Sequence, residues 1–100
     1  MAFYTIHPKD IDNILKEKRA ILVDIRSNEK YKEFHMNRAI NIPFEDSEKW
    51  LCTFRKDRCW MLYCEYGSTS LYVARKLGKM GHEVYTIIGG MNAIKAYFYN

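Results

Sequence analysis

The sequence has no long hydrophobic run. Its longest unbroken apolar stretch is Cys59–Cys64, far shorter than the ~20 residues that a membrane-spanning helix needs. Near the start of the chain, Lys9, Asp10 and Asp12 interrupt the region where the apolar core of a signal peptide would lie. We therefore expect no membrane partner, and the cytoplasm is the expected location.

Cysteine is also scarce. The chain contains 3 cysteines, Cys52, Cys59 and Cys64, separated by six and four residues. A secreted disulfide scaffold uses a dense, even-numbered set, and a zinc site uses closely paired ligands such as Cys-x2-Cys. Neither pattern is present, so we expect no metal. Each thiol is either a buried core residue or a reactive group.

The sequence does contain enough apolar residues for one core. They make up 48% of the chain, which excludes an intrinsically disordered protein. A length of 100 residues corresponds to a single domain over residues 1–100. The formal net charge is +4, but the cations lie in short groups near expected helix ends, without a basic stripe or an RNA-binding motif. We therefore expect no nucleic-acid partner.

Extended and helical patterns alternate along the chain. Apolar runs predict strands over residues 4–6, 20–24, 39–42, 59–64 and 84–88. Helices are expected in between, one beginning at Pro8 and others over about 27–34, 45–55, 71–80 and 91–97. The apolar faces expected for the last two helices comprise Leu71, Ala74, Leu77 and Met80, and Met91, Ile94 and Tyr97. This alternation predicts an α/β fold with an open, mostly parallel sheet and helices on both faces.

Cys64 stands where α/β proteins bind ligands, at the carboxyl end of a predicted strand. Gly67 allows a tight turn after it, and Ser68, Thr69 and Ser70 are small enough to let backbone N–H groups point inward. Convergent N–H donors at a helix start form an anion site, which stabilises a thiolate. Position alone leaves Cys64 open to two interpretations, a nucleophile or one more buried cysteine.

The other two cysteines are expected to be structural. Cys59 begins the strand that Cys64 ends, and at ~3.3 Å per residue the two lie more than ~10 Å apart. Cys52 lies on an expected helix beside Leu51. Neither position places a thiol at the ligand-binding edge of the sheet.

Four motifs resemble those of the rhodanese-like domain family. The first is Asp24-Ile25-Arg26-Ser27 followed by Glu29 and Tyr31, and the second is His35 followed by Ala39-Ile40-Asn41-Ile42-Pro43. The third matches the active-site loop of the family, Cys64-Glu65-Tyr66-Gly67-Ser68-Thr69-Ser70, and the fourth is Gly89-Gly90-Met91 at the start of the final helix. Their order, over nearly the whole chain, makes the resemblance specific.

The resemblance implies a five-stranded α/β domain that transfers sulfur without a metal or other cofactor. The thiolate of Cys64 would attack a sulfur donor and keep its outer sulfur as a persulfide, held by the N–H groups of loop 64–70. A thiol or cyanide would then remove that sulfur. The implied partners are a small-molecule or protein sulfur donor and a thiophilic acceptor.

The loop departs from the family at two positions. Members of the family often have arginine just after the cysteine and at the fifth position after it, where this chain has Glu65 and Thr69. An anion close to the sulfur opposes thiolate formation and repels dianionic thiosulfate. We therefore expect weak use of thiosulfate and a different donor, such as a persulfide.

The other polar residues of the motifs have scaffold interpretations beside functional ones. Asp24 and Arg26 end a strand and either line the mouth of the site or form salt bridges, with Glu29 as the expected partner of Arg26. His35 is expected to be a hydrogen-bonded structural residue, and Tyr66 to shape access to the loop.

Two other functions share parts of this pattern. Phosphatases and arsenate reductases of related architecture need Cys-x5-Arg, in which the arginine binds the oxyanion through two hydrogen bonds. Counted from Cys64, that position is Ser70, which disfavours them. A non-catalytic rhodanese-like module is the second alternative. The missing loop arginines favour it, and the presence of Cys64 and Gly67 opposes it.

Overall fold

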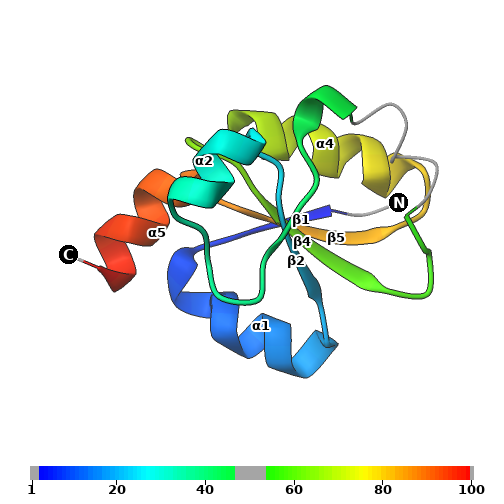
Figure 1. Cartoon of the computed structure of the whole chain (residues 1–100). Helices are drawn as coiled ribbons and strands as arrows, with labels where there is room; N and C mark the ends of the chain where they lie inside the picture. Colours follow the sequence, from blue (N-terminus) through cyan, green and yellow to red (C-terminus); the bar gives the residue numbers. More distant parts are fainter. Residues whose placement is uncertain (1–2, 47–53, 100) are drawn as a thin grey trace.

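The sheet has five parallel strands in the order β1-β5-β4-β2-β3 (Figure 1). The computed structural model describes residues 3–46 and 54–99. The strands are β1 (Phe3–Ile6), β2 (Ile21–Asp24), β3 (Ile40–Asn41), β4 (Cys59–Tyr63) and β5 (Glu83–Ile87). The predicted α/β architecture is confirmed, and every pairing between the described strands is parallel.

Helices cover both faces of the sheet. They are α1 (Ile11–Lys18), α2 (Asn28–Glu33), α4 (Ser68–Lys79) and α5 (Gly90–Phe98), with short 3-10 helices η1 (Pro8–Asp10) and η2 (Phe44–Asp46). Successive side chains of the central strands point to opposite faces of the sheet and pack into two separate cores. Met61 of β4 packs with residues of α1 and α5, whereas the next residue, Leu62, packs with residues of α4. Figure 1 shows α4 on the opposite side of the strands from α1 and α5.

Local signals explain where the first helices begin. Pro8 occupies the first position of η1, where its missing N–H costs no hydrogen bond, and His7 Nδ1 accepts the N–H of Lys9 at 3.0 Å. Ser27 caps α2 because its hydroxyl accepts the N–H of Lys30 at 3.3 Å. Both starts confirm the sequence prediction.

Three expectations about helices need correction. The helix expected over 45–55 is replaced in its described part by η2, and Phe54 and Arg55 are not helical; residues 47–53, including Cys52, lie outside the described residues. Met80 is 40% exposed because it follows the end of α4, where Val73 occupies the buried face instead. Tyr97, expected in the core, is 53% exposed in the last turn of α5.

The described helices are short. Among them, none is long and apolar enough to cross a lipid bilayer. The longest, α4, spans Ser68–Lys79, and its exposed positions include Arg75 and Lys76. These exposed cations match its place as a surface layer over the sheet.

Candidate active site

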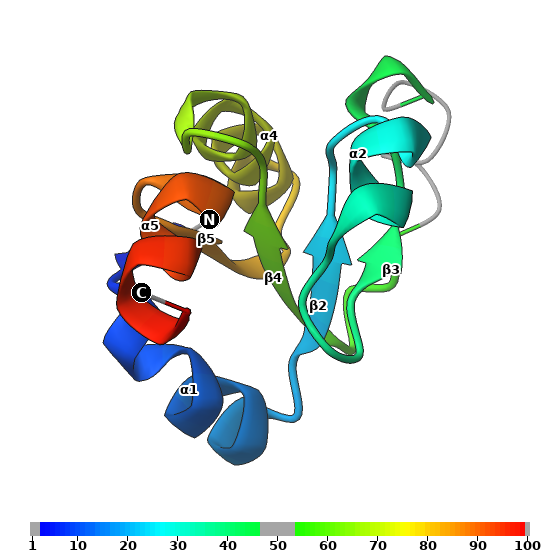
Figure 2. The same cartoon turned by 60° about the vertical axis from the view of Figure 1, so that its left-hand side comes forward.

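Cys64 follows β4 and opens the loop that turns into α4 (Figure 2). Its side chain is buried, and two backbone donors reach its sulfur: the N–H of Gly67 at 3.1 Å and that of Ser70 at 3.3 Å from Sγ. Such N–H groups carry fixed partial positive charge and need no reorganisation when the sulfur becomes an anion. The arrangement is suited to hold a thiolate or a persulfide.

Glycines shape the backbone of this loop. Gly67 has φ +104°, and a Cβ there would lie 2.9 Å from the nitrogen of Gly89. Gly90 has φ +58°, and a Cβ there would lie 2.8 Å from the carbonyl carbon of Glu65. Residues with a side chain rarely adopt such angles and would also collide with the facing backbone. The loop after Cys64 and the turn at residues 89–90 can therefore pack together only with glycine at these two positions.

The start of α5 holds the loop in place through backbone hydrogen bonds. The N–H of Met91 donates to the carbonyl of Cys64 at 2.8 Å, and the N–H of Asn92 donates to the carbonyl of Glu65 at 3.0 Å. These donors belong to the first turn of a helix, where backbone N–H groups lack partners inside the helix. The Gly89-Gly90-Met91 motif thus positions the cysteine itself, a role that the sequence did not assign.

A pair of buried hydroxyls lies beside the sulfur. Thr86 of β5 donates to Ser70 Oγ at 2.8 Å, and Ser70 donates to the carbonyl of Gly67 at 3.2 Å. Cys64 Sγ lies 3.5 Å from the same Ser70 oxygen. Sequence reasoning missed Thr86, although a hydroxyl inside an apolar strand was a usable signal, because a buried polar group needs a partner.

Arg26 binds two carboxylates at the carboxyl edge of the sheet. Its Nη2 lies 2.8 Å from Asp24 Oδ2, and its Nη1 lies 3.1 Å from Glu65 Oε1. Burial by itself would lower the pKa of Arg26, but the hydrogen bonds to Asp24 and Glu65 outweigh it and raise that pKa. Arg26 therefore remains a cation between two acids.

The expected pairing of Arg26 with Glu29 is wrong. Glu29 lies exposed in the first turn of α2, whereas Asp24 is completely buried and needs a cation beside it. The pairing with Glu65 also changes the electrostatics of the loop. The acid next to the cysteine is bound to a guanidinium, although the Asp24–Arg26–Glu65 group keeps one excess negative charge.

A pocket of about 200 Å3 lies beside the loop. Tyr66, Gly67 and Ser68 of the loop line it together with Thr86 of β5 and Ile88, which is 54% exposed. No lysine, arginine, aspartate or glutamate is among its described lining residues. Thr86 connects this pocket with the sulfur, because its hydroxyl binds Ser70.

The remaining candidates lie apart from this arrangement or have structural partners. His35 stacks on the ring of Tyr31 at 3.7 Å between centroids, and its Nδ1 lies 2.7 Å from the Tyr31 carbonyl oxygen. Cys59 begins β4 at the other end of the strand, where burial raises its pKa to about 11. Within residues 3–46 and 54–99, no cluster of histidine, cysteine, aspartate and glutamate could hold a metal ion.

Comparison with known proteins identifies the class to which this fold and loop belong. The family model described as Rhodanese-like domain matches residues 7–97. A tRNA sulfurtransferase of Pyrobaculum aerophilum is 31% identical over 87 residues, covering 87% of this chain but 18% of that protein. The thiosulfate sulfurtransferase GlpE of Coxiella burnetii is 28% identical over 85 residues, covering 84% of this chain and 79% of that protein.

A solved structure is also similar to this chain. The crystal structure of a rhodanese-like domain protein from Staphylococcus aureus matches with a TM-score of 0.80 and 27% identity, covering 91% of this chain and 90% of that chain. This chain belongs to the rhodanese-like domain family. It spans about a fifth of the length of the tRNA sulfurtransferase and most of the length of GlpE.

Proposed function

We propose that this protein is a sulfurtransferase that carries sulfane sulfur as a persulfide on Cys64. The observation that carries the proposal is the pair of N–H groups, from Gly67 and Ser70, that point at the buried sulfur. A purely structural cysteine needs no such donors, because a neutral thiol is a weak hydrogen-bond acceptor. Relatives named as sulfurtransferases support the same reaction class.

The reaction has two displacement steps. The Cys64 thiolate attacks the outer sulfur of a donor, the donor's bond to that sulfur breaks, and the leaving group departs with the electron pair. This step leaves Cys64 as an anionic persulfide. An acceptor nucleophile then attacks the outer sulfur, the S–S bond of the persulfide breaks, and the thiolate returns. Covalent catalysis thus divides one difficult transfer into two easier ones, and no external oxidant is required.

The charge around the loop points to a donor other than thiosulfate. The Asp24–Arg26–Glu65 group has one excess negative charge, and the neighbouring pocket offers no cation among its described lining residues. A dianion such as thiosulfate gains little binding energy there. A persulfide with an uncharged body, in contrast, fits a neutral pocket of about 200 Å3. A reactive thiol also needs a reducing compartment, so the cytoplasm remains the expected location.

Intact-mass measurement after exposure to sulfur donors tests the proposal. The wild-type protein should gain one sulfur from a small-molecule persulfide and lose it to cyanide. Cys64→Ser should gain none, and Cys59→Ser serves as the matched control because that thiol lies at the far end of β4. Sulfur addition that survives in Cys64→Ser, or no addition from any donor, would contradict the proposal and favour a non-catalytic binding module.

Glu65→Gln tests the inferred choice of donor. Removing the acid should leave Arg26 with one carboxylate partner and make the mouth of the loop neutral. We expect kcat/KM for thiosulfate to rise by about threefold to tenfold, because one like charge near an anionic substrate costs about 1 kcal/mol at moderate salt. Turnover of a persulfide with an uncharged body should change less, because it carries less negative charge than dianionic thiosulfate. An unchanged thiosulfate rate would show that Glu65 does not limit this donor.

A further inference from the structure

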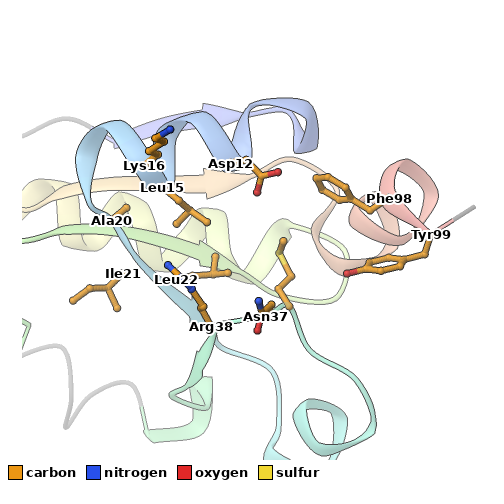
Figure 3. A pocket seen from close by; sticks show the side chains of 11 residues that line it. Asp12, Leu15, Lys16, Ala20, Ile21, Leu22, Asn37, Arg38, Phe98 and Tyr99 are labelled. Carbon is orange, nitrogen blue, oxygen red and sulfur yellow. The ribbon is translucent and has the colours of Figure 1, made fainter.

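A groove of about 770 Å3 lies between α1, the C-terminal end of α5 and the segment that leads into β3 (Figure 3). Its lining includes Ala20 and Ile21, at the start of β2, whereas Cys64 follows the end of the parallel neighbour β4. None of its described lining residues belongs to loop 64–70. The groove is therefore separate from the candidate active site.

The lining of this groove combines apolar side chains with four polar ones. Leu15, Leu22 and Met36 contribute aliphatic surface, and the rings of Phe98 and Tyr99 lie at one end (Figure 3). Tyr99 is 59% exposed although it is aromatic. Binding sites for small molecules usually have volumes of about 300–1,000 Å3 and apolar walls with a few polar groups.

Arg38 occupies an unusual backbone position at the edge of the groove. The N–H of Ala39 donates to the carbonyl of Met36 at 3.0 Å, so residues 36–39 form a tight turn with Arg38 as its third residue. The φ of Arg38 is +74°, in the left-handed region that favours glycine or asparagine. A strained backbone at a cavity wall is a reason to look for function, because strain of this kind concentrates at binding and catalytic sites.

The charges at the rim are unbalanced. Lys16 and Arg38 both line the groove, and neither forms an ion pair with a described carboxylate. Asp12 is the one acid in the lining, and it lies across the groove from Arg38 (Figure 3). The rim therefore carries two cations and one anion beside apolar side chains, which complements a ligand that has an apolar body and one negative charge.

We propose that this groove binds a small organic carboxylate with a flat apolar body. The body lies against Leu15, Leu22 and the ring of Phe98, and the carboxylate accepts hydrogen bonds from the guanidinium of Arg38. Guanidinium and carboxylate match in shape and can form two parallel hydrogen bonds. The binding does not depend on sulfur transfer at Cys64.

A pair of probes that differ only in charge tests the proposal. 1-Naphthylacetate has a flat aromatic body and one carboxylate, and 1-naphthylacetamide replaces the carboxylate with a neutral amide. In two-dimensional amide NMR titrations, naphthylacetate should shift the signals of Leu15, Asn37, Arg38 and Tyr99. Its Kd should be about tenfold lower than that of the amide, as expected for a charge-assisted hydrogen bond.

Substitutions at the rim should move the affinity in opposite directions. Arg38→Gly removes the cation and suits the positive φ, so the protein should remain folded while the Kd for naphthylacetate rises about tenfold. Arg38→Lys keeps the charge but not the two parallel hydrogen bonds, so its Kd should lie between those of the wild-type protein and Arg38→Gly. Asp12→Asn should lower the Kd. Lys79→Ala, which removes an exposed cation from α4 on the other face of the sheet, is the control for net charge.

Four results would overturn the proposal. The first is equal affinity for the acid and the amide, and the second is an affinity unchanged in Arg38→Gly. The third is a set of shifted signals that maps to loop 64–70 instead of the groove. The fourth is the absence of shifted signals at the solubility limit of the probe. A thermal denaturation of each variant shows that any loss of binding occurs in a folded protein.

Discussion

The sulfur of Cys64 is surrounded by backbone donors and hydroxyls instead of side-chain cations. The N–H groups of Gly67 and Ser70 reach Sγ, while the nearby guanidinium of Arg26 is bound to Asp24 and Glu65. Fixed backbone dipoles in a buried site are weakly screened by salt, unlike exposed charges. Stabilisation of the thiolate should therefore depend on the loop conformation more than on ionic strength.

At the residue scale, the two described cysteines should differ strongly in reactivity. At about pH 7, iodoacetamide should alkylate Cys64 much faster than Cys59, because burial raises the pKa of Cys59 to about 11 and leaves about one molecule in ten thousand as thiolate. Alkylation of Cys59 should accelerate as the pH rises toward that value. Peptide mass analysis at timed intervals measures both rates.

The control for this comparison is Cys64→Ser, in which the fast phase should disappear. Slow labelling of Cys59 should remain unchanged in that variant. Equal and slow labelling of both thiols in the wild-type protein would be the signature of an inert, partner-binding module.

Thr86 is a positioning residue in the proposed mechanism. By donating to Ser70 Oγ, it occupies one lone pair of that oxygen. The Ser70 proton, which binds the Gly67 carbonyl in this structure, can then turn to the sulfur when Cys64 ionises. Thr86→Val should slow the alkylation of Cys64 by about threefold to tenfold and lower the free energy of unfolding by about 1 kcal/mol. Its pH–rate profile for alkylation should move to higher pH.

The conservative variant Thr86→Ser keeps the hydroxyl and provides the control. It should retain the wild-type alkylation profile while losing a buried methyl group. If Thr86→Ser slows alkylation as much as Thr86→Val, the effect arises from packing and the positioning role is wrong.

At the scale of elements, the packing of loop 64–70 against α5 depends on one close contact between their backbones. Gly90→Ala should destabilise the fold by more than ~2 kcal/mol and slow the alkylation of Cys64, because the added Cβ collides with the backbone of residues 64 and 65. Urea unfolding gives the loss of stability, and alkylation kinetics report on the loop.

Gly81→Ala is the matched control for this prediction. Gly81 also has a positive φ, +97°, but a Cβ there would meet nothing closer than 3.7 Å, the end of the Lys56 side chain. This variant should lose only about 1 kcal/mol of unfolding free energy, from backbone strain. Its Cys64 should be alkylated at the wild-type rate. Similar losses in the two variants would mean that the close approach at Gly90 adds little.

The sequence predicted where helices and strands lie better than it predicted which residues pack against each other. Strand β4 and the start of α2 could be recognised because apolar runs and a capping serine are local features. The buried face of α4 was only partly recognised, because Met80 continues the apolar spacing beyond the last helical residue. The spacing of apolar residues alone does not show where the surface that packs against a helix ends.

At the scale of the whole molecule, the stability should fall in mild acid. His82 is 2% exposed, and its Nδ1 has no hydrogen-bond partner among the described residues. Burial lowers the pKa of His82, and nearby Lys56 acts in the same direction. Below about pH 6.5, the unfolded chain binds a proton that the folded chain disfavours, so acid favours unfolding.

Urea unfolding at several pH values measures this effect. The contribution of His82 to the free energy of unfolding should be fully present above about pH 6.5 and should decrease as the pH falls below it. His82→Leu removes the titrating group, so the stability of this variant should change less between about pH 7.5 and about pH 5 than that of the wild-type protein. An identical change in both proteins would assign the acid sensitivity to other groups.

The sequence by itself determined the order of the strands along the chain and the positions of Cys59 and Cys64 at opposite ends of β4. Those features follow from hydrophobic periodicity and from the length of a strand, both of which are local. Only the tertiary structure decided that Arg26 binds Glu65 instead of Glu29, that Thr86 reaches Ser70, and that α5 holds the carbonyl of Cys64. These contacts join residues far apart in the chain, and they form because folding buries polar groups that must then find partners.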